Sequence, residues 1–191
     1  MELETARLRL DALQANDAEA LFRYRADPRI SRFQGWRPDS VVDAEHFIQH
    51  QSGTSIDVPG RWVQRAIRLR EGSDLIGDLG IHLPAEAEAS VEFGISVASG
   101  FQGMGYACEA LQAVFGLIFD RLNRHRIHAS VDPRNPASIA LLRSLGMRQE
   151  AHHRESLWLH GEWVDDVVFA LLAREWSASH APTDPNRPSS R

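Results

Sequence analysis

The sequence is poor in cysteine and has no long apolar run, and these two absences narrow the classes of protein it can encode. Cys108 is its only cysteine, which excludes an internal disulfide framework and is typical of a reducing cytoplasm. No stretch of about 18 consecutive apolar residues is present, so the sequence predicts no membrane-spanning helix. The opening residues, MELETARLRLDAL, lack the apolar core of a secretion signal. We therefore expect a cytoplasmic protein.

The chain also lacks an excess of positive charge. It carries 21 Lys and Arg against 26 Asp and Glu, for a formal net charge of -5, so it presents no broad basic field for a nucleic acid or an anionic membrane. Its 191 residues and hydrophobic fraction of 43% suit one globular domain. The residues from Ser177 onward are rich in Ser, Pro and Asn and predict a disordered tail. Residues 1–176 are thus the expected domain.

Hydrophobic periodicity predicts helices and strands in an irregular order. The first expected elements are a strand around 7–11, a helix at 17–26 that 27–29 closes, a loop at 30–40 and a helix at 41–51. Strands at 61–70, 75–83 and 90–97 follow, then a helix from 106, a strand at 126–132, a helix at 136–145 and a hairpin that turns at 160–162. This order indicates a mixed α/β domain and not a regular βαβ repeat.

A glycine-rich stretch, SGFQGMGYACEA at 99–110, separates an alternating strand from the helix that begins near Tyr106. Free amides at a helix start favour an anion, and glycines let a turn aim successive amides at one point. We interpret Gln102, Gly103, Met104, Gly105, Tyr106 and Ala107 as a phosphate cradle that acts mainly through its backbone. A tight turn with no ligand is the alternative. No Lys follows as in a nucleotide P-loop, and Cys108 stands where a dinucleotide fingerprint needs its third glycine.

A second motif, DPRNPASIALLRSLGM, has its own helix signals. Asn135 suits the N-cap, Pro136 suits the first helical position, and Gly146 suits a left-handed stop. These signals predict a helix from Pro136 to about Leu145 whether or not the segment has a function.

The spacing Q-x-x-G-x-A, met by Gln102, Gly105 and Ala107, resembles the coenzyme A pyrophosphate loop of the GNAT superfamily of N-acetyltransferases. The segments TARLRLDAL, DAEALF, DLGIHL, VEFGISV, FQGMGYACEAL, HRIHASVDPRNPASIALLRSLGM and GEWVDDVVFALLAREW follow in the order of that family. They are similar to its branch of Rim-type ribosomal-protein N-terminal acetyltransferases. The resemblance spans about Thr5 to Trp176, and it implies a mostly antiparallel central sheet flanked by helices.

The resemblance also implies a cosubstrate and roles for residues near it. The cosubstrate is acetyl-CoA, and the reaction is direct attack by an amine in a ternary complex, with no metal. Asn135 and Ser138 are expected beside the pantetheine and thioester, and a backbone N–H around Ile95, Ser96 or Val97 is expected to stabilise the oxyanion. Many family members carry a tyrosine acid where this chain has Leu142. The acid is therefore open between Ser138 and solvent.

The strand that leads into the cradle carries the best-placed candidate for a general base. Glu92 shares a face with Gly94 and Ser96, so Glu92 is the candidate base, with a solvated strand residue as the alternative. His82 with Asp78, and His128, are further candidates. Cys108, near the helix start, is better interpreted as a small packed side chain than as a nucleophile.

The acceptor is the least defined partner. An α-amino group titrates near 7.7–8.0 and lysine near 10.4, so a protein N-terminus needs only a weak base. A protein N-terminus is thus the favoured acceptor. A small amine such as an antibiotic, polyamine or amino acid is the alternative, as is a non-catalytic acyl-CoA-binding module. Phe33 and Trp36 are expected either to contact the acceptor or to fill the core, and a homodimer stays open.

Overall fold

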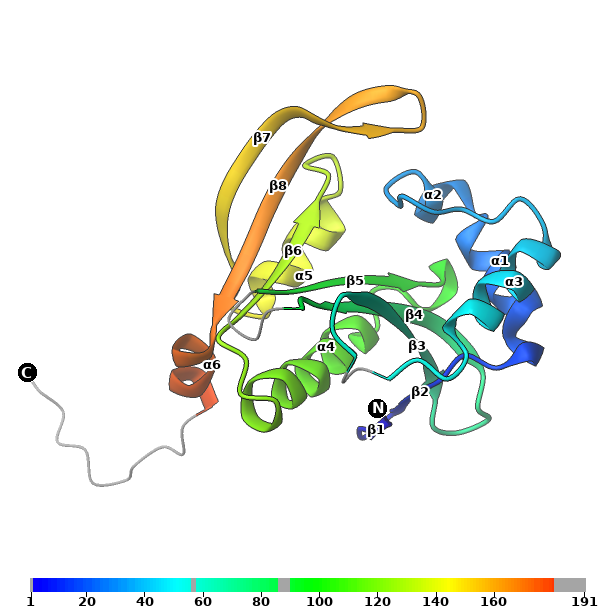
Figure 1. Ribbon diagram of the computed structural model, residues 1–191, viewed down its shortest axis with the longest axis horizontal. Helices are drawn as coiled ribbons and strands as arrows, with labels where there is room; N and C mark the ends of the chain where they lie inside the picture. The colour runs from blue at the N-terminus through cyan, green and yellow to red at the C-terminus, as the bar shows by residue number, and fades with distance from the viewer. Residues whose placement is uncertain (1, 56–57, 86–89, 181–191) are drawn as a thin grey trace, which may run out of the picture.

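The computed structural model describes residues 2–55, 58–85 and 90–180. Its eight strands form one sheet in the order β1-β2-β3-β4-β5-β6-β8-β7 (Figure 1). The strands are β1 (Leu3–Glu4), β2 (Leu8–Asp11), β3 (Arg61–Leu69), β4 (Leu75–Leu83), β5 (Val91–Val97), β6 (Arg126–Val131), β7 (Arg148–Leu159) and β8 (Glu162–Leu172). Six of the seven pairings are antiparallel, and only β5 with β6 is parallel. The expected mixed, mostly antiparallel sheet is confirmed.

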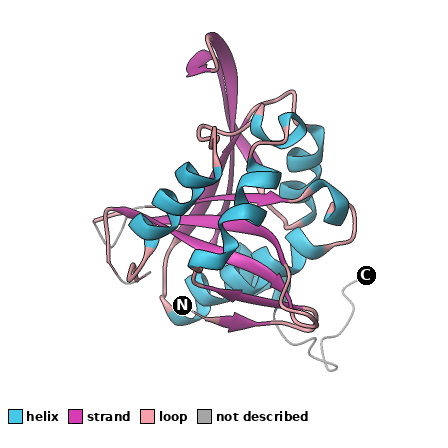
Figure 2. Ribbon diagram, turned by 90° about the vertical axis from the view of Figure 1, so that its right-hand side faces the viewer, coloured by secondary structure: helices cyan, strands magenta, loops and turns pink. Residues whose placement is uncertain are grey.

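Helices cover both faces of this sheet (Figure 2). They are α1 (Ala18–Arg25), α2 (Pro28–Ser31), α3 (Val41–Gln51), α4 (Tyr106–Gly116), α5 (Pro136–Ser144) and α6 (Ala173–His180), and a π-helical turn, Leu117–Arg121, continues α4. One buried cluster joins the sheet to α4, α5 and α6 through residues such as Phe115, Leu142 and Trp176. A second cluster joins the opposite face to α1 and α3, with Leu21 and Ile48 as members. No helix within the described ranges is long and apolar enough to cross a bilayer.

Local capping explains where several helices begin. Ser40 and Asp43 form a capping box at α3, in which each side chain bonds the backbone of the other. Asn135 accepts a hydrogen bond from the Ser138 amide at 3.2 Å, and Pro136 occupies the first position of α5. The cap by Asn135 follows the sequence prediction.

Three features differ from the expected elements. The segment 27–29 does close α1, but Asp27 also caps the short helix α2, so the predicted loop from Ile30 begins inside a helix. The two-residue strand β1 and the helix α6 were not predicted. Because α6 continues to His180, the chain stays helical past Ser177, the predicted start of the tail, and residues 181–191 lie outside the described residues.

The parallel pairing of β5 with β6 is unusually short. It joins only Val91 to Ile127 and Glu92 to His128, although β5 continues to Val97 along β4. Beyond Glu92 the two strands therefore separate, and the free edge of β5 faces a gap. This gap is where the site lies.

Candidate functional site

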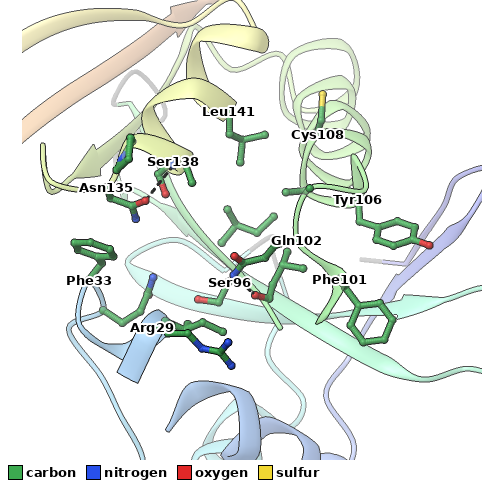
Figure 3. Close-up of a pocket in the computed structure, with 18 of the residues that line it drawn as sticks. Arg29, Phe33, Ser96, Phe101, Gln102, Tyr106, Cys108, Asn135, Ser138 and Leu141 are labelled. Atoms are coloured by element: carbon green, nitrogen blue, oxygen red, sulfur yellow. Dashed lines mark hydrogen bonds between the residues drawn. The ribbon is translucent and has the colours of Figure 1, made fainter. Parts of the chain in front are cut away.

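A cavity of about 470 Å³ opens at this gap, a size typical of a small-molecule site. Four parts of the chain line it: α2 with the loop that follows, the end of β5, the turn into α4, and the start of α5 (Figure 3). The lining residues are Arg29, Ile30, Arg32, Phe33, Gln34, Ile95, Ser96, Val97, Phe101, Gln102, Gly103, Gly105, Tyr106, Ala107, Cys108, Asn135, Pro136, Ala137, Ser138 and Leu141. The two sequence motifs and β5 thus meet at one cavity.

The glycine-rich turn has the backbone geometry of an anion cradle. Gly103 has φ 75° and Gly105, the N-cap of α4, has φ 81°, conformations that favour glycine. A Cβ at Gly103 would meet no atom within 4 Å, so the space beside it is open. The first amides of α4 have no partner within the helix. The turn can therefore hold a diphosphate by backbone donors at a helix start.

Gln102 and Met104 serve the turn in ways that the sequence alone does not reveal. The Gln102 side chain donates to the Val97 carbonyl at 2.8 Å, which ties the turn to the end of β5. Met104 does not line the cavity, and the residue is 53% exposed. Its carbonyl accepts from Arg7 at 3.0 Å, so Met104 contributes to the outer side of the turn.

Arg7 is an unpredicted support for the turn. Its guanidinium lies over the Tyr106 ring at 4.5 Å and forms a 2.6 Å ion pair with Glu109. Burial acts to raise the pKa of Glu109, but hydrogen bonds from Thr5 and Arg7 outweigh it, and the pKa is lowered. Glu109 therefore stays ionised and fixes the first turn of α4 against the N-terminal strands.

The free edge of β5 presents unpaired backbone groups to the gap. The Ala98 amide donates to Ile76 of β4 at 2.8 Å. Because bonded and non-bonded residues alternate in an antiparallel pair, the amides of Ile95 and Val97 point away from β4. The Val97 carbonyl, which meets Gln102, points the same way. Amides of Ile95 and Val97 are thus available to a ligand in the gap.

Ser96 has a buried hydroxyl without a hydrogen-bond partner among the described residues. Its side chain lines the cavity, the residue is only 4% exposed, and its Oγ finds no hydrogen-bond partner among the described residues. Such a group is costly to bury unless something completes it. A polar ligand atom in the cavity would do so.

Glu92 lies at the last position where β5 still pairs with β6. Its register partners are His82 on β4 and His128 on β6, and it does not line the cavity. Burial lowers the pKa of His128, and the charge of Glu92 opposes this only in part. A Cβ at Gly94, the next residue on the same face, would meet no atom within 4 Å. An open space thus separates Glu92 from Ser96.

Asp78 is not available as a base. It is fully buried, pairs with Arg25 at 2.5 Å and accepts a 2.6 Å hydrogen bond from Tyr24. Burial first, and Asp78 second, raise the pKa of Tyr24, so the hydroxyl stays a donor. Arg25 also donates to Gln34 Oε1 at 3.1 Å. The cluster therefore fixes a residue of the cavity wall.

The two aromatic residues predicted at the acceptor side lie in different places. Phe33 lines the cavity. Trp36 instead stacks on Phe47, with ring centroids 4.3 Å apart, and packs against the core beside α3. The role of Trp36 as an acceptor contact stays a prediction, and its packing supports the loop that carries Phe33.

At α5, Asn135 and Ser138 both line the cavity, and Ser138 is half-buried. Leu142, one turn later, is 3% exposed within the core, so it offers no proton donor. Cys108 lines the cavity from the first turn of α4. Within the described ranges, no three His, Cys, Asp or Glu side chains gather to hold a metal ion.

The β7–β8 hairpin does not line the cavity in the described part of the chain, but it contacts one of the elements that do. It extends beyond the rest of the fold and its end reaches α2 (Figure 1), where His160 Nε2 lies 3.0 Å from the Ser31 carbonyl. Sequence reasoning missed this contact, and it missed Arg29, Arg32 and Gln34 as wall residues. Nothing local marks them, because distant segments bring them to the site.

Comparisons with known proteins point to one family of enzymes. The family model described as "Acetyltransferase (GNAT) domain" matches residues 7–148. An uncharacterized N-acetyltransferase, p20, of Bacillus licheniformis is 31% identical over 92% of this chain and 98% of its own length. The ribosomal protein uS5-alanine N-acetyltransferase of Escherichia coli is 34% identical over 44% of this chain and 43% of its own. The spermidine N(1)-acetyltransferase of Vibrio cholerae is 32% identical over 46% of this chain and 50% of its own.

Solved structures share the fold. A GNAT-family acetyltransferase from Bacillus anthracis has a TM-score of 0.81 at 24% identity, over 92% of this chain and 100% of its own. The family model matches most of the chain, and the p20 relative is 31% identical over nearly the whole of both chains. The chain therefore belongs to the GNAT acetyltransferase family and is an acetyl-CoA-dependent N-acetyltransferase.

Proposed function

We propose that this enzyme acetylates the α-amino group of a protein N-terminus. The observation that carries the proposal is the open space over Gly94, between Glu92 and the unpartnered hydroxyl of Ser96, beside the free edge of β5. An extended peptide end can enter such a space with its amine foremost. The resemblance to a uS5-alanine N-acetyltransferase supports the same acceptor class.

In this proposal the two sequence motifs bind the cosubstrate. The backbone of Gln102, Gly103, Gly105, Tyr106 and Ala107 holds the diphosphate, with the outer face of the turn made by Met104. Asn135 and Ser138 contact the pantetheine and the thioester end. Acetyl-CoA supplies an activated acetyl group and a thiolate leaving group.

The residues of the chain then act on the acceptor. Glu92 takes a proton from the amine through water, and the amine attacks directly in a ternary complex. Its nitrogen forms a bond to the acetyl carbon as the bond from that carbon to sulfur breaks, and the thiolate is protonated by Ser138 or solvent. The amides of Ile95 and Val97 are the proposed oxyanion donors, worth about 3–4 kcal/mol. Phe33 contacts the acceptor, and Trp36 holds its loop.

A weak base suffices for this acceptor. An α-amino group has a pKa near 7.7–8.0, so roughly a tenth of it is neutral at pH 7, whereas a lysine side chain near 10.4 is almost wholly protonated. Glu92 is a carboxylate beside a His128 whose pKa is lowered, so a neutral imidazole faces it near pH 7. This pair can accept a proton without a strong buried base.

Polyamine acetylation is the second candidate, since a spermidine acetyltransferase is among the relatives. A thiol-release assay with acetyl-CoA tests both, using N-terminal peptides, lysine peptides, polyamines and aminoglycosides as acceptors. We expect turnover with N-terminal peptides. Turnover with spermidine alone would replace the proposal by the second candidate. Tight CoA binding with no turnover on any amine would indicate a binding module.

A further inference from the structure

The wall that α2 and its following loop contribute to the cavity is rich in donors. We define the α2 wall as Arg29, Arg32, Phe33 and Gln34, all of which line the cavity. None of the described residues that line this cavity is Asp or Glu. Figure 3 shows Arg29 and Phe33 across the cavity from Cys108 and Tyr106, where α4 begins. This side of the cavity thus lacks the negative charge that would bind a polycation.

Gln34 is held so that its donor group is left for a ligand. Arg25 can only donate, and its Nη1 lies 3.1 Å from Gln34 Oε1, which fixes the orientation of the amide. Arg25 is itself fixed by the buried Asp78. No described residue accepts a hydrogen bond from the Gln34 NH2 group. This group therefore remains available as a donor on the wall.

The two arginines of the wall differ in their charge balance. Arg29 is paired with Asp27 at 2.7 Å, and Asp27 also caps α2 and accepts from Ser99 at 2.8 Å. Arg32 has no carboxylate partner among the described residues, and its guanidinium lies over the Phe33 ring at 4.4 Å. The wall therefore carries one uncompensated positive charge, held in place by stacking.

No described residue of the cavity lining is a carboxylate that could pair with Arg32. Outside the cavity lining, Asp132 and Glu162 are both bonded to the single Arg134, so that group keeps one negative charge. Asp78 is buried and matched by Arg25. Among the charged residues in the described part of the chain that line the cavity, Arg29 is paired with Asp27 and Arg32 alone has no carboxylate partner.

We propose that the α2 wall binds a carboxylate of the acceptor, with Arg32 supplying the charge and Gln34 a hydrogen bond. The preferred acceptor is then a peptide with Asp or Glu next to its N-terminal residue, and polyamines are disfavoured. This inference rests on the proposed function, because it names the class of N-terminus that the same site takes. A phosphate of CoA is the other anion that Arg32 could meet, and the test separates the two.

The experiment compares three peptides that differ only at the second residue: Ala-Asp, Ala-Asn and Ala-Lys at the N-terminus. Initial rates are measured with saturating acetyl-CoA at low and high salt. The enzyme contains no lysine, so lysine self-acetylation adds no background. We expect kcat/KM to favour Asp over Asn by about fivefold at low salt, and less at high salt.

Arg32→Gln is the test variant and Arg37→Gln the matched control. Arg37 is an exposed arginine of the same loop, is bonded to Asp39 and does not line the cavity. Arg32→Gln is expected to abolish the preference for Asp, and Arg32→Glu to invert it toward Lys. Arg37→Gln is expected to retain it. The Kd for CoA, from calorimetry, is expected to stay the same in all three variants.

Other outcomes would overturn the inference in distinguishable ways. Equal rates on the three peptides would leave N-terminal acetylation standing and refute the role of the α2 wall. A weaker Kd for CoA in Arg32→Gln, with the peptide preference unchanged, would reassign Arg32 to a phosphate. Free aspartate acetylated in place of any peptide, with loss in Arg32→Gln, would support the wall and refute the protein acceptor. Turnover with spermidine alone would refute both.

Discussion

Asp78 and Arg25 form an ion pair that is closed to solvent yet governs the cavity wall. The carboxylate is fully buried, the arginine is 6% exposed, and their closest atoms are 2.5 Å apart. Gln64 and Tyr24 each donate a hydrogen bond to this carboxylate. Nη1 of Arg25 donates to Gln34 Oε1. One buried charge thus connects β4 through α1 to the acceptor side of the site.

Asp78→Asn tests this connection. The substitution leaves the Arg25 charge buried without a counter-charge, so we expect the free energy of unfolding to fall by about 3–5 kcal/mol. In enzyme that remains folded, the KM for the acceptor is expected to rise, because Gln34 loses its anchor. Urea denaturation and steady-state kinetics measure both effects.

Asp39→Asn is the control for that variant. Asp39 belongs to an exposed ion pair with Arg37, and such pairs contribute about 1 kcal/mol or less. Equal losses of stability in the two variants would contradict a special role for the buried pair.

Gly105→Ala tests the cradle. At φ 81° an alanine is strained, and its Cβ would lie 3.3 Å from Arg7 Nη2. The turn must therefore shift, and its amides no longer point at the diphosphate. We expect the Kd for CoA to increase by about tenfold or more, with a modest loss of stability. Calorimetry with CoA measures the affinity.

Gly161→Ala is a strain-matched control. Gly161 has φ 89° in the turn of the β7–β8 hairpin, where a Cβ would meet no atom within 4 Å, and it does not line the cavity. It is expected to lose stability but not CoA affinity. A CoA Kd that the Gly105 substitution leaves unchanged would refute the cradle.

The sequence predicted what depends on neighbouring residues. The cap of α5 by Asn135 was predicted, since it works within a few positions along the chain, and the cap of α3 by Ser40 and the turn at Gly105 are equally local. The cavity could be located for this reason, because two of its walls are helix starts. The assigned chemical roles of Glu92 and Ser138 stay predictions.

What the sequence could not predict depends on contacts between distant segments. Arg7 reaches a carbonyl 97 positions away, and Arg25 reaches a carboxylate 53 positions away. The pairing of β5 with β6 ends at Glu92 and His128, and this early end opens the gap. The helix α2 has only four residues, which is too short for a periodicity signal.

Ser96→Ala tests the unpartnered hydroxyl by opposite effects on stability and activity. Removing a buried hydroxyl that lacks a partner removes its desolvation cost of about 1–3 kcal/mol, so the free enzyme is expected to keep or gain stability. If a substrate completes this hydroxyl, kcat/KM is expected to fall by about tenfold. Thermal unfolding and peptide kinetics are the measurements, and an unchanged kcat/KM would exclude Ser96 from the reaction.

His128 gives the fold a predictable response to acid. Burial lowers its pKa below the usual 6.5, so below pH 6.5 the unfolded chain binds a proton that the folded chain resists, and stability declines as pH falls. His128→Gln is expected to flatten the part of this decline that lies just below pH 6.5. Urea midpoints measured between pH 8 and 5 check it. Identical slopes for the two proteins would mean that His128 does not contribute.

Glu92→Gln tests the proposed base through the pH dependence of kcat/KM. The neutral fraction of an α-amino acceptor falls as pH drops below its pKa of about 8, so a group that takes the proton matters most in that range. A positioned base contributes about 10²–10⁴-fold, and the variant is expected to lose most of its rate at low pH and least at high pH, where solvent already deprotonates the amine. The control is Glu19→Gln, an exposed carboxylate on α1 that does not line the cavity. A Glu92→Gln profile parallel to that of the control would move the proton transfer to His128 or to solvent, and measuring the double variant with His128→Gln would distinguish those two.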